Sequence, residues 1–147
     1  MFKHILIPTD GSKTADKAVQ AGIEFARDSN AKVTALVAMP TYPTPSRNQL
    51  ISGKYEPIEK YEQRTLAQGA KVLERVEKIG KAAGVKVNAD VVLSDTPYDA
   101  IIKSAKKNGC DLIFMASHGR TGLQELLHGS QTHEVLTKST IPTLVYR

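Results

Sequence analysis

The sequence predicts a doubly wound α/β domain, with a single, mostly parallel sheet of five strands and helices on both faces. Two observations carry this prediction. Short apolar runs alternate along the chain with longer segments in which apolar residues recur every three or four positions, and this alternation of strands and helices builds a parallel sheet. Most of the short runs are also continuously apolar, which is typical of strands buried on both faces.

We expect the strands where the short apolar runs lie. The third run alternates apolar and polar residues, which indicates one wetter face and a position at an edge of the sheet. The other runs have continuously apolar centres. The five expected strands are residues 3–8, 33–39, 85–93, 111–116 and 142–146.

The segments between these runs carry helical periodicity. Gly84 follows the longest of them as a C-terminal cap, and Pro97 opens the next in the first turn, where its missing N–H is tolerated. Residues 40–57 interrupt the pattern with four prolines. We interpret them as a long loop, which is either a lid or contact surface or a flexible connector. The four expected helices are residues 13–29, 59–83, 97–107 and 130–138.

The connections predict the order of the strands. Right-handed crossovers restrict the topology, and the economical order for five strands is 3-2-1-4-5, so that the connection reverses direction between the first strand and the fourth. Ligands of such sheets bind at this switch point, outside the carboxyl ends of the two strands. Residues 8–12 and 116–130 are expected there. Residues 1–147 together fit one domain.

Composition narrows the class of protein. Apolar residues make up 41% of the 147 residues, enough for a full core. The single cysteine, Cys110, excludes an internal disulfide framework, and we expect it to be a small buried residue. The first apolar stretch ends at Pro8 without a cleavage site, and no apolar run approaches the roughly 18 residues of a membrane span. We therefore expect a cytoplasmic protein without a membrane partner.

The formal net charge of +5 does not indicate a nucleic-acid binder. Proteins of that class gather Lys and Arg on one face and add aromatic residues, whereas the basic residues here are scattered and many alternate with acids. We expect a small-molecule ligand, and the positive balance favours a polyanion. The four histidines lack the spacing and acidic partners of a metal site. We predict no catalytic residues.

A phosphate site is predicted at the switch point. Gly119 and Gly129 allow backbone N–H groups to approach an anion closely. Ser130 opens the last expected helix, where free N–H groups favour negative charge, and Arg120 adds a positive charge. The alternative is that Ser130 is only a helix N-cap and the glycines only form turns. His118 either lines this loop or is a solvated loop residue.

Asp10 directly follows the first strand. An acid repels a phosphate, so Asp10 suits a ribose hydroxyl or a magnesium ion. The alternative is a turn residue within Asp-Gly-Ser, which is common, and the spacing leaves both interpretations open. Asp95 and Asp99 lie at the start of the third expected helix, where the helix dipole accounts for them.

Segments at both ends of the chain resemble the universal stress protein family. KHILIPTDGS at residues 3–12 is similar to the family's first strand and ligand loop. MASHG at residues 115–119, followed after nine residues by Gly129-Ser130, is similar to its nucleotide motif. That motif reads Gly, two residues, Gly, nine residues, Gly, then Ser or Thr. IPTLV at residues 141–145 is similar to the last strand, so the resemblance covers essentially the whole chain.

The resemblance implies ATP or AMP at the switch point and a homodimer through the last strand, which an exposed edge strand also favours on physical grounds. It places Pro8 and Asp10 near base and ribose, and the backbone of Ala38 against adenine. Magnesium bound to the nucleotide would contact Asp10 and Ser130. The predicted nucleotide site comprises Pro8, Thr9, Asp10, Ala38, Met115, Ala116, Ser117, His118, Gly119, Arg120, Thr121, Gly122, Gly129, Ser130, Gln131 and Thr132.

One position departs from the family motif, because Ala116 stands where the first glycine is expected. Its methyl group narrows the space for the ribose or phosphate. The predicted function is an adenine-nucleotide-binding stress-response protein that acts as a dimeric regulatory or protective module. The alternatives are a nucleotide-free interaction or scaffold protein of the same fold, and a slow ATPase or autophosphorylating protein, for which no general base stands beside the phosphate loop.

Overall fold

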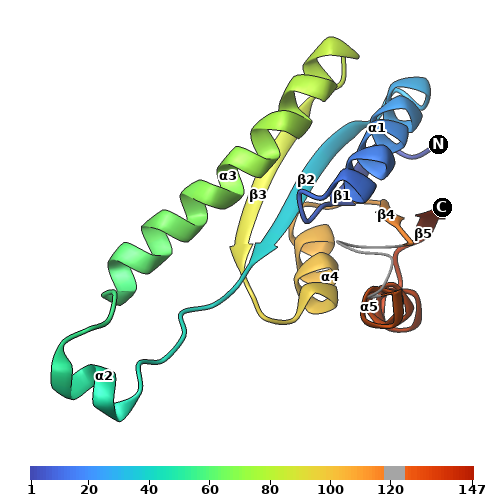
Figure 1. The fold of residues 1–147 in the computed structure, drawn as a ribbon. Helices are drawn as coiled ribbons and strands as arrows, with labels where there is room; N and C mark the ends of the chain where they lie inside the picture. The colour runs from blue at the N-terminus through green and yellow to red at the C-terminus, as the bar shows by residue number, and fades with distance from the viewer. Residues whose placement is uncertain (118–124) are drawn as a thin grey trace.

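A parallel five-stranded sheet in the order β3-β2-β1-β4-β5 confirms the predicted fold class and strand order. The structure is a computed structural model that describes residues 1–117 and 125–147, with side chains for all of these except residues 125–130. The elements, in chain order, are β1 His4–Pro8, α1 Lys13–Asp28, β2 Lys32–Met39, α2 Arg47–Ser52, α3 Ile58–Ala82, β3 Val87–Leu93, α4 Pro97–Lys107, β4 Leu112–Ala116, α5 Glu125–Lys138 and β5 Thr143–Tyr146 (Figure 1).

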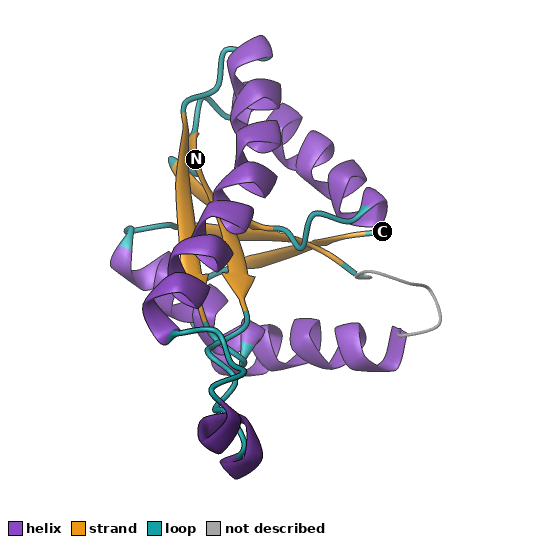
Figure 2. Ribbon diagram, turned by 60° about the vertical axis from the view of Figure 1, so that its left-hand side comes forward, coloured by secondary structure: helices purple, strands orange, loops and turns teal. Residues whose placement is uncertain are grey.

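Helices cover both faces of the sheet (Figure 2). On one face, α1 and α3 pack on the strands through residues such as Ile23 and Leu73. On the other face, α4 and α5 contribute Ile101 and Val135 to a second core cluster. The sheet is thus the middle of three layers, which is the arrangement that the alternation of strands and helices predicts.

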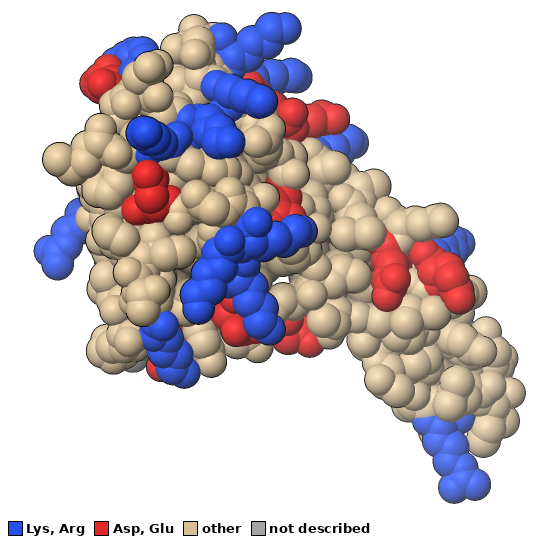
Figure 3. Space-filling model, turned by 180° about the vertical axis from the view of Figure 1, so that it is seen from behind, with Lys and Arg blue, Asp and Glu red and all other residues tan. Residues whose placement is uncertain are grey.

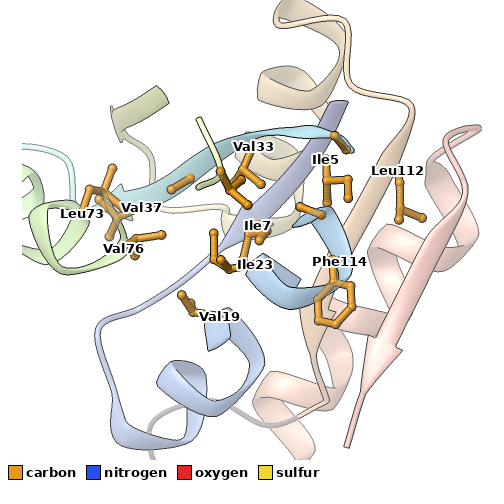
Figure 4. Close-up of a cluster of buried hydrophobic side chains, with 14 residues drawn as sticks. Ile5, Ile7, Val19, Ile23, Val33, Val37, Leu73, Val76, Leu112 and Phe114 are labelled. Carbon is orange, nitrogen blue, oxygen red and sulfur yellow. The ribbon is translucent and has the colours of Figure 1, made fainter. Parts of the chain in front are cut away.

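The continuous apolar runs are explained by this double burial. Ile5 and Ile7 of β1 join the cluster under α1 and α3, while Leu6 between them joins the cluster under α4 and α5. All three side chains are fully buried. Figure 4 shows the first cluster, in which Ile23 and Phe114 approach the β1 side chains from α1 and β4. Such a strand needs apolar residues at every position.

Small residues let the helices lie close to the sheet. A Cβ placed on Gly69 of α3 would lie 2.5 Å from Cγ1 of Val91 on β3, and one on Gly22 of α1 would lie 2.7 Å from Cδ1 of Ile7. Neither distance leaves room for a methyl group. The two glycines therefore set the spacing between the helical layer and the strands, which outweighs their low helix propensity.

Polar groups are buried at the amino ends of the strands. His4 lies at the start of β1, and its Nε2 is 2.7 Å from Oγ1 of the buried Thr34 on β2. Asp111 accepts hydrogen bonds from the N–H groups of Lys3 and His4 at 2.9 and 3.0 Å. Cys110 is buried as predicted, and its burial raises the pKa of the thiol to about 11, so the thiol is protonated and unreactive at neutral pH.

Three expectations differ from the structure by more than one residue. Residues 40–57 were expected to be a loop throughout but contain α2, which a capping box between Ser46 and Gln49 stabilises. The last helix begins at Glu125 instead of Ser130, since Glu-Leu-Leu are good helix formers and a helix tolerates one glycine. β3 begins at Val87 instead of Val85, because the N–H of Val85 bonds to Gly80 O at the end of α3.

None of the helices in the described part of the chain is both long and apolar enough to cross a membrane. The longest, α3, carries charged residues along its exposed side and buries only one face, through residues such as Leu73 and Val76. This pattern is that of a surface helix in a globular fold.

His4 makes the stability of the fold depend on pH. Burial, and then the nearby Lys32, lower the pKa of His4 below its ordinary value of 6.5. The unfolded chain therefore binds a proton below about pH 6.5 that the folded chain resists, so stability is complete above that pH and falls as the pH decreases. We expect His4→Gln to reduce the loss of unfolding free energy between about pH 7.5 and about pH 5, measured by urea denaturation.

The matched control is His133→Gln, which replaces an exposed histidine of α5. It should leave the difference between the two pH values as it is in the wild type. Equal pH dependence in the wild type and His4→Gln would contradict the role assigned to His4.

Candidate functional site

The loop after β1 is fixed by its own polar groups. The N–H of Thr9 donates to Leu36 O (2.8 Å), and the buried Oγ1 of Thr9 accepts from the N–H of Gly11 (3.1 Å). Asp10 Oδ1 accepts from the N–H of Ser12 (2.9 Å). Gly11 has a φ of +79°, which favours glycine. The first part of the predicted site is therefore held in one conformation at the carboxyl end of β1.

The strands β1 and β4 separate at their carboxyl ends, and Pro8 accounts for the separation. Their pairing ends at Leu6 opposite Ile113, whereas β1 stays paired with β2 as far as Pro8. Backbone groups of successive strand residues point to opposite sides. The N–H of Thr9 points to Leu36 on β2, so the nitrogen of Pro8 points to β4 and has no hydrogen to donate. The ladder between β1 and β4 ends here.

The backbone N–H and C=O of Ala38 point toward the β1 side of β2, at a level beyond the end of β1. The last pair between β1 and β2 is Pro8 opposite Leu36, so β2 extends beyond β1. Met39 O accepts from the N–H of Ser94 (2.8 Å), which lies after β3. Because neighbouring residues alternate, the N–H and C=O of Ala38 point away from β3. These groups could bind the polar edge of a base.

The end of β4 faces α5. Ala116 is still paired with Tyr146 of β5, and the N–H of Ser117 donates to Tyr146 O (2.9 Å). Thr132 of α5 lies 3.4 Å from Ala116 O through its Oγ1 and is buried. Met115 is also buried, beneath these contacts. The structure thus brings the predicted residues of β4 and α5 together, on the opposite side of the separated strands from Ala38.

Gln131 has a role that the sequence did not reveal. Its Oε1 accepts from the N–H of Tyr98 (2.9 Å) in the first turn of α4. The N-cap residue of α4, Thr96, makes no side-chain cap bond of its own, so α5 supplies the missing acceptor. Lys138 adds a second tie, 3.3 Å from the Tyr98 hydroxyl and 4.6 Å from its ring, while pairing with Glu134 at 2.7 Å. Gln131 and Lys138 of α5 thus both contact Tyr98 of α4 and hold the two helices together.

The phosphate part of the predicted site is only partly described. Gly129 and Ser130 lie within α5, which begins at Glu125, so they are not at the N-terminus of this helix as the sequence predicted. The N-cap alternative for Ser130 is wrong for the same reason. The predicted site residues His118, Gly119, Arg120, Thr121 and Gly122 lie outside the described residues.

Asp10 is a turn residue in the structure, and only one of its two carboxylate oxygens is used by the turn. Its Oδ1 holds the turn to Ser12, while Oδ2 has no hydrogen-bond partner among the described residues. Within residues 1–117 and 125–147, no group of three His, Cys, Asp or Glu could hold a metal ion. A magnesium ion at Asp10 would therefore need most of its oxygen ligands from a bound phosphate and from water.

Asp95 has a different role from the one expected. It precedes α4 and accepts from both the N–H (3.0 Å) and the hydroxyl of Thr41, just beyond β2. The two hydrogen bonds lower the pKa of the Asp95 carboxyl. The role of Asp95 is therefore to hold the segment after β2, rather than to interact with the dipole of α4. Asp99 does lie in the first turn of α4, where it pairs with Lys103 at 2.7 Å.

A groove of about 300 Å³ lies between β3 and α4, apart from the predicted site. Most of its polar side chains are already paired within the protein. Asp90 Oδ2 accepts from the hydroxyl of Ser104 (2.5 Å) and from Asn108 Nδ2 (3.3 Å), and Lys103 pairs with Asp99. The groove therefore offers few unpaired groups to a ligand.

The hydrogen bond between Gln131 and the N–H of Tyr98 can be tested by measuring the free energy of unfolding. Gln131→Ala removes the acceptor and leaves an N–H of the α4 first turn without a partner, so we expect a loss of about 0.5–2 kcal/mol in the free energy of unfolding. Gln131→Glu keeps an acceptor and adds a charge that suits a helix N-terminus, so it should retain the stability. Urea denaturation of the two variants at neutral pH checks this, and equal losses would contradict the capping role.

Comparisons with known proteins agree with the fold and the motifs. All of residues 1–147 match the model of the universal stress protein family. The chain is 33% identical to universal stress protein MJ0577 of Methanocaldococcus jannaschii, covering 100% of this chain and 96% of that protein. It is 32% identical to universal stress protein YxiE of Bacillus subtilis, covering 100% of both. The solved structure of MJ0577 has a TM-score of 0.78, with 31% identity over 99% of this chain and 95% of that chain.

More distant structures share the fold. UspA from Lactobacillus plantarum has a TM-score of 0.79 at 18% identity, covering 99% of this chain and 97% of that one. A universal stress protein in complex with cAMP has a TM-score of 0.73 at 21% identity, with the same coverage. The full-length family match and relatives above 30% identity agree with the motifs at both ends of the chain, so this protein belongs to the universal stress protein family.

Proposed function

We propose that this protein binds an adenine nucleotide, ATP or AMP, at the carboxyl ends of β1 and β4. The observation that carries the proposal is that the β1–β4 ladder ends at Leu6, because Pro8 has no N–H to continue it. The strand order reverses at the same point, and ligands of doubly wound sheets bind where these two features coincide. The loop at Asp10, the outward-turned backbone of Ala38 and the contact between Ala116 and Thr132 surround this position.

Structural neighbours support an adenine ligand. One universal stress protein with this fold was solved in complex with cAMP. Another, from Archaeoglobus fulgidus, was solved in complex with dAMP, with a TM-score of 0.63 at 15% identity over 100% of this chain and 98% of that one. Both ligands combine adenine with a ribose-type sugar and phosphate. We infer the same ligand class here from the family and from the groups at this position.

In this proposal each part of the nucleotide meets a different element. Adenine lies against the backbone of Ala38, and the ribose lies near Pro8 and Asp10. The phosphates approach Gly129 and Ser130 on α5 together with residues 118–122. The free Oδ2 of Asp10 would contact the ribose or a magnesium ion held by the phosphates. We expect the protein to act as a dimeric regulatory or protective module in the cytoplasm.

Two observations favour a second candidate function, a nucleotide-free interaction protein of the same fold. Ala116 carries a methyl group where the family motif has glycine. The side chain of Gln131, expected near the phosphates, is engaged with α4 instead. Nucleotide titration distinguishes the two candidates.

The proposed dimer uses the free edge of β5. The N–H of Ile113 donates to Pro142 O, and that of Ser117 donates to Tyr146 O. Pro142, just before β5, and Tyr146 within it turn their backbone to β4, so the backbone groups of Val145, an odd number of residues from each, point to the open edge. An unpaired edge of this kind can pair with its copy about a twofold axis.

Nucleotide binding should appear in calorimetric titrations with ATP and AMP, with and without magnesium. Ser130→Ala should weaken binding about tenfold or more, because a hydrogen bond to a charged phosphate is worth roughly 1.5–3 kcal/mol. Ala116→Gly should strengthen binding by enlarging the site. The control Thr140→Ala, at an exposed position after α5, should not change it. Absence of binding by the wild type and by Ala116→Gly would overturn the proposal and favour the interaction protein.

Dimerisation can be measured by light scattering coupled to size-exclusion chromatography. Val145→Lys places a charge on the β5 edge, so we expect it to yield monomers. Ala89→Lys places the same charge at an exposed position of β3, at the opposite edge of the sheet, and should leave the dimer intact. A dimer that survives Val145→Lys but dissociates in Ala89→Lys would place the interface on the β3 edge and contradict the proposal.

A further inference from the structure

Residues 40–57 form an arm that projects from the body of the protein (Figure 1). At its far end, α2 buries none of its residues. The relative exposure is 56% for Leu50, 76% for Ile51, 43% for Tyr55 and 44% for Ile58, which follows the arm. Exposed apolar side chains that gather in one place usually mark an interaction surface. None of these four side chains belongs to either core cluster.

The arm is held in a defined conformation by its base. The hydroxyl of Tyr42 donates to Glu56 O (2.6 Å), which joins the outgoing and returning segments. Arg64 of α3 donates to both carboxylate oxygens of Glu56 at 2.8 and 3.2 Å. The ring of Tyr42 packs edge-on against Tyr61, whose hydroxyl donates to Pro40 O (3.0 Å). Because the base is fixed, little conformational entropy is lost when the tip meets a partner.

The tip of the arm, residues 47–55, carries only positive charge. Residues 40–55 contain two charged residues, Arg47 and Lys54, and no acid. Both are exposed. Arg47 lies three and four residues before Leu50 and Ile51 on α2, so the three side chains share one side of the helix. Figure 3 shows the arm as mostly uncharged, with positive charge at its far end and negative charge only toward the body.

We propose that the tip of the arm docks on an anionic lipid surface. Apolar side chains rimmed by cations match the boundary between headgroups and acyl chains, where the apolar groups enter and the cations meet anionic headgroups. The net charge of +5 adds a favourable long-range attraction. The proposal departs from the expectation of no membrane partner, which rested on the absence of an apolar run long enough to span a bilayer. The proposed contact is peripheral and requires no spanning helix.

The size of the tip favours a lipid surface over a protein partner. A standard protein interface uses roughly 20–30 residues on each side and about 800 Å² per partner. The tip, residues 47–55, has fewer residues than that, and α3, which follows the arm, exposes no large apolar residue between Ile58 and Leu66. A bilayer accommodates a few inserted side chains without a complementary surface, and the resulting binding is weak and reversible.

Sedimentation with vesicles tests the proposal. The wild type should sediment with vesicles that contain about one third phosphatidylglycerol in phosphatidylcholine, but not with phosphatidylcholine alone, and raised salt should weaken the binding. Ile51→Glu should reduce the bound fraction at least tenfold. The matched control is Leu136→Glu, at a residue of 51% exposure on α5, which should bind as the wild type does.

The cations are tested by a pair of double variants. Arg47→Gln with Lys54→Gln should weaken binding about tenfold, since each basic residue near an anionic surface is worth about 1 kcal/mol. Lys17→Gln with Lys106→Gln removes the same charge from exposed positions on α1 and α4 and should have a smaller effect. Equal losses in the two double variants would show that net charge alone attracts the protein, which would overturn docking through the tip.

Insertion has its own spectroscopic test, because the chain contains no tryptophan. Leu50→Trp introduces a single emitter on α2 at the tip, where Leu50 is 56% exposed, and its emission should shift to the blue with anionic vesicles. Leu136→Trp should not shift. If the wild type fails to bind anionic vesicles, if Ile51→Glu binds like the wild type, or if Leu50→Trp does not shift, the proposal is wrong. Loss of a protein–protein contact by Ile51→Glu without vesicle binding would assign the tip to a protein partner instead.

Discussion

The separation of β1 from β4, where we propose that a nucleotide binds, depends on one missing hydrogen, at the nitrogen of Pro8. β1 is the central strand, so it must pair on both sides. Its pairing with β2 continues to Pro8, but on the β4 side it ends at Leu6 because the next donor does not exist. At the carboxyl ends of the strands, the backbone groups of Ala38 on β2 and of the end of β4 therefore have no strand between them. Unpaired backbone groups need partners, and the polar edges of a nucleotide can supply them.

The rest of the fold holds this edge in place from both sides. Asp10 and Thr9 lock the loop after β1 with their own side chains, so its shape does not depend on a ligand. On the other side, Thr132 contacts the end of β4, while Gln131 ties the same turn of α5 to Tyr98 on α4. A displacement of α5 would therefore also break its hydrogen bond to the first turn of α4. The proposed site lies between these two supports, and a preformed site lowers the ordering cost of binding a ligand.

Most of the fold could be predicted from the sequence because its determinants are local. Continuous apolar runs such as Ile5–Ile7 and helical periodicity follow directly from burial on two faces or one, and strand order follows from chirality. What could not be predicted depends on contacts between distant residues. Asp95 was expected to be a helix-dipole residue but binds Thr41, and the contact of the Gln131 side chain with the first turn of α4 has no signal in the sequence. The capping box of α2 was a local signal, obscured by the surrounding prolines.

The arm and the proposed nucleotide site leave the sheet from the same strand but are mechanically separate. β2 ends at Met39, one residue after Ala38, and Thr41 is then clamped by Asp95 of the β3–α4 connection. Further out, Arg64 and Tyr61 anchor the arm to α3. All of these anchors lie on the β3 side of β2, whereas the separated strands lie on its β1 side. Of the interpretations that the sequence left open for residues 40–57, the structure therefore favours a contact surface over a lid, because a lid would have to break this base to reach the site.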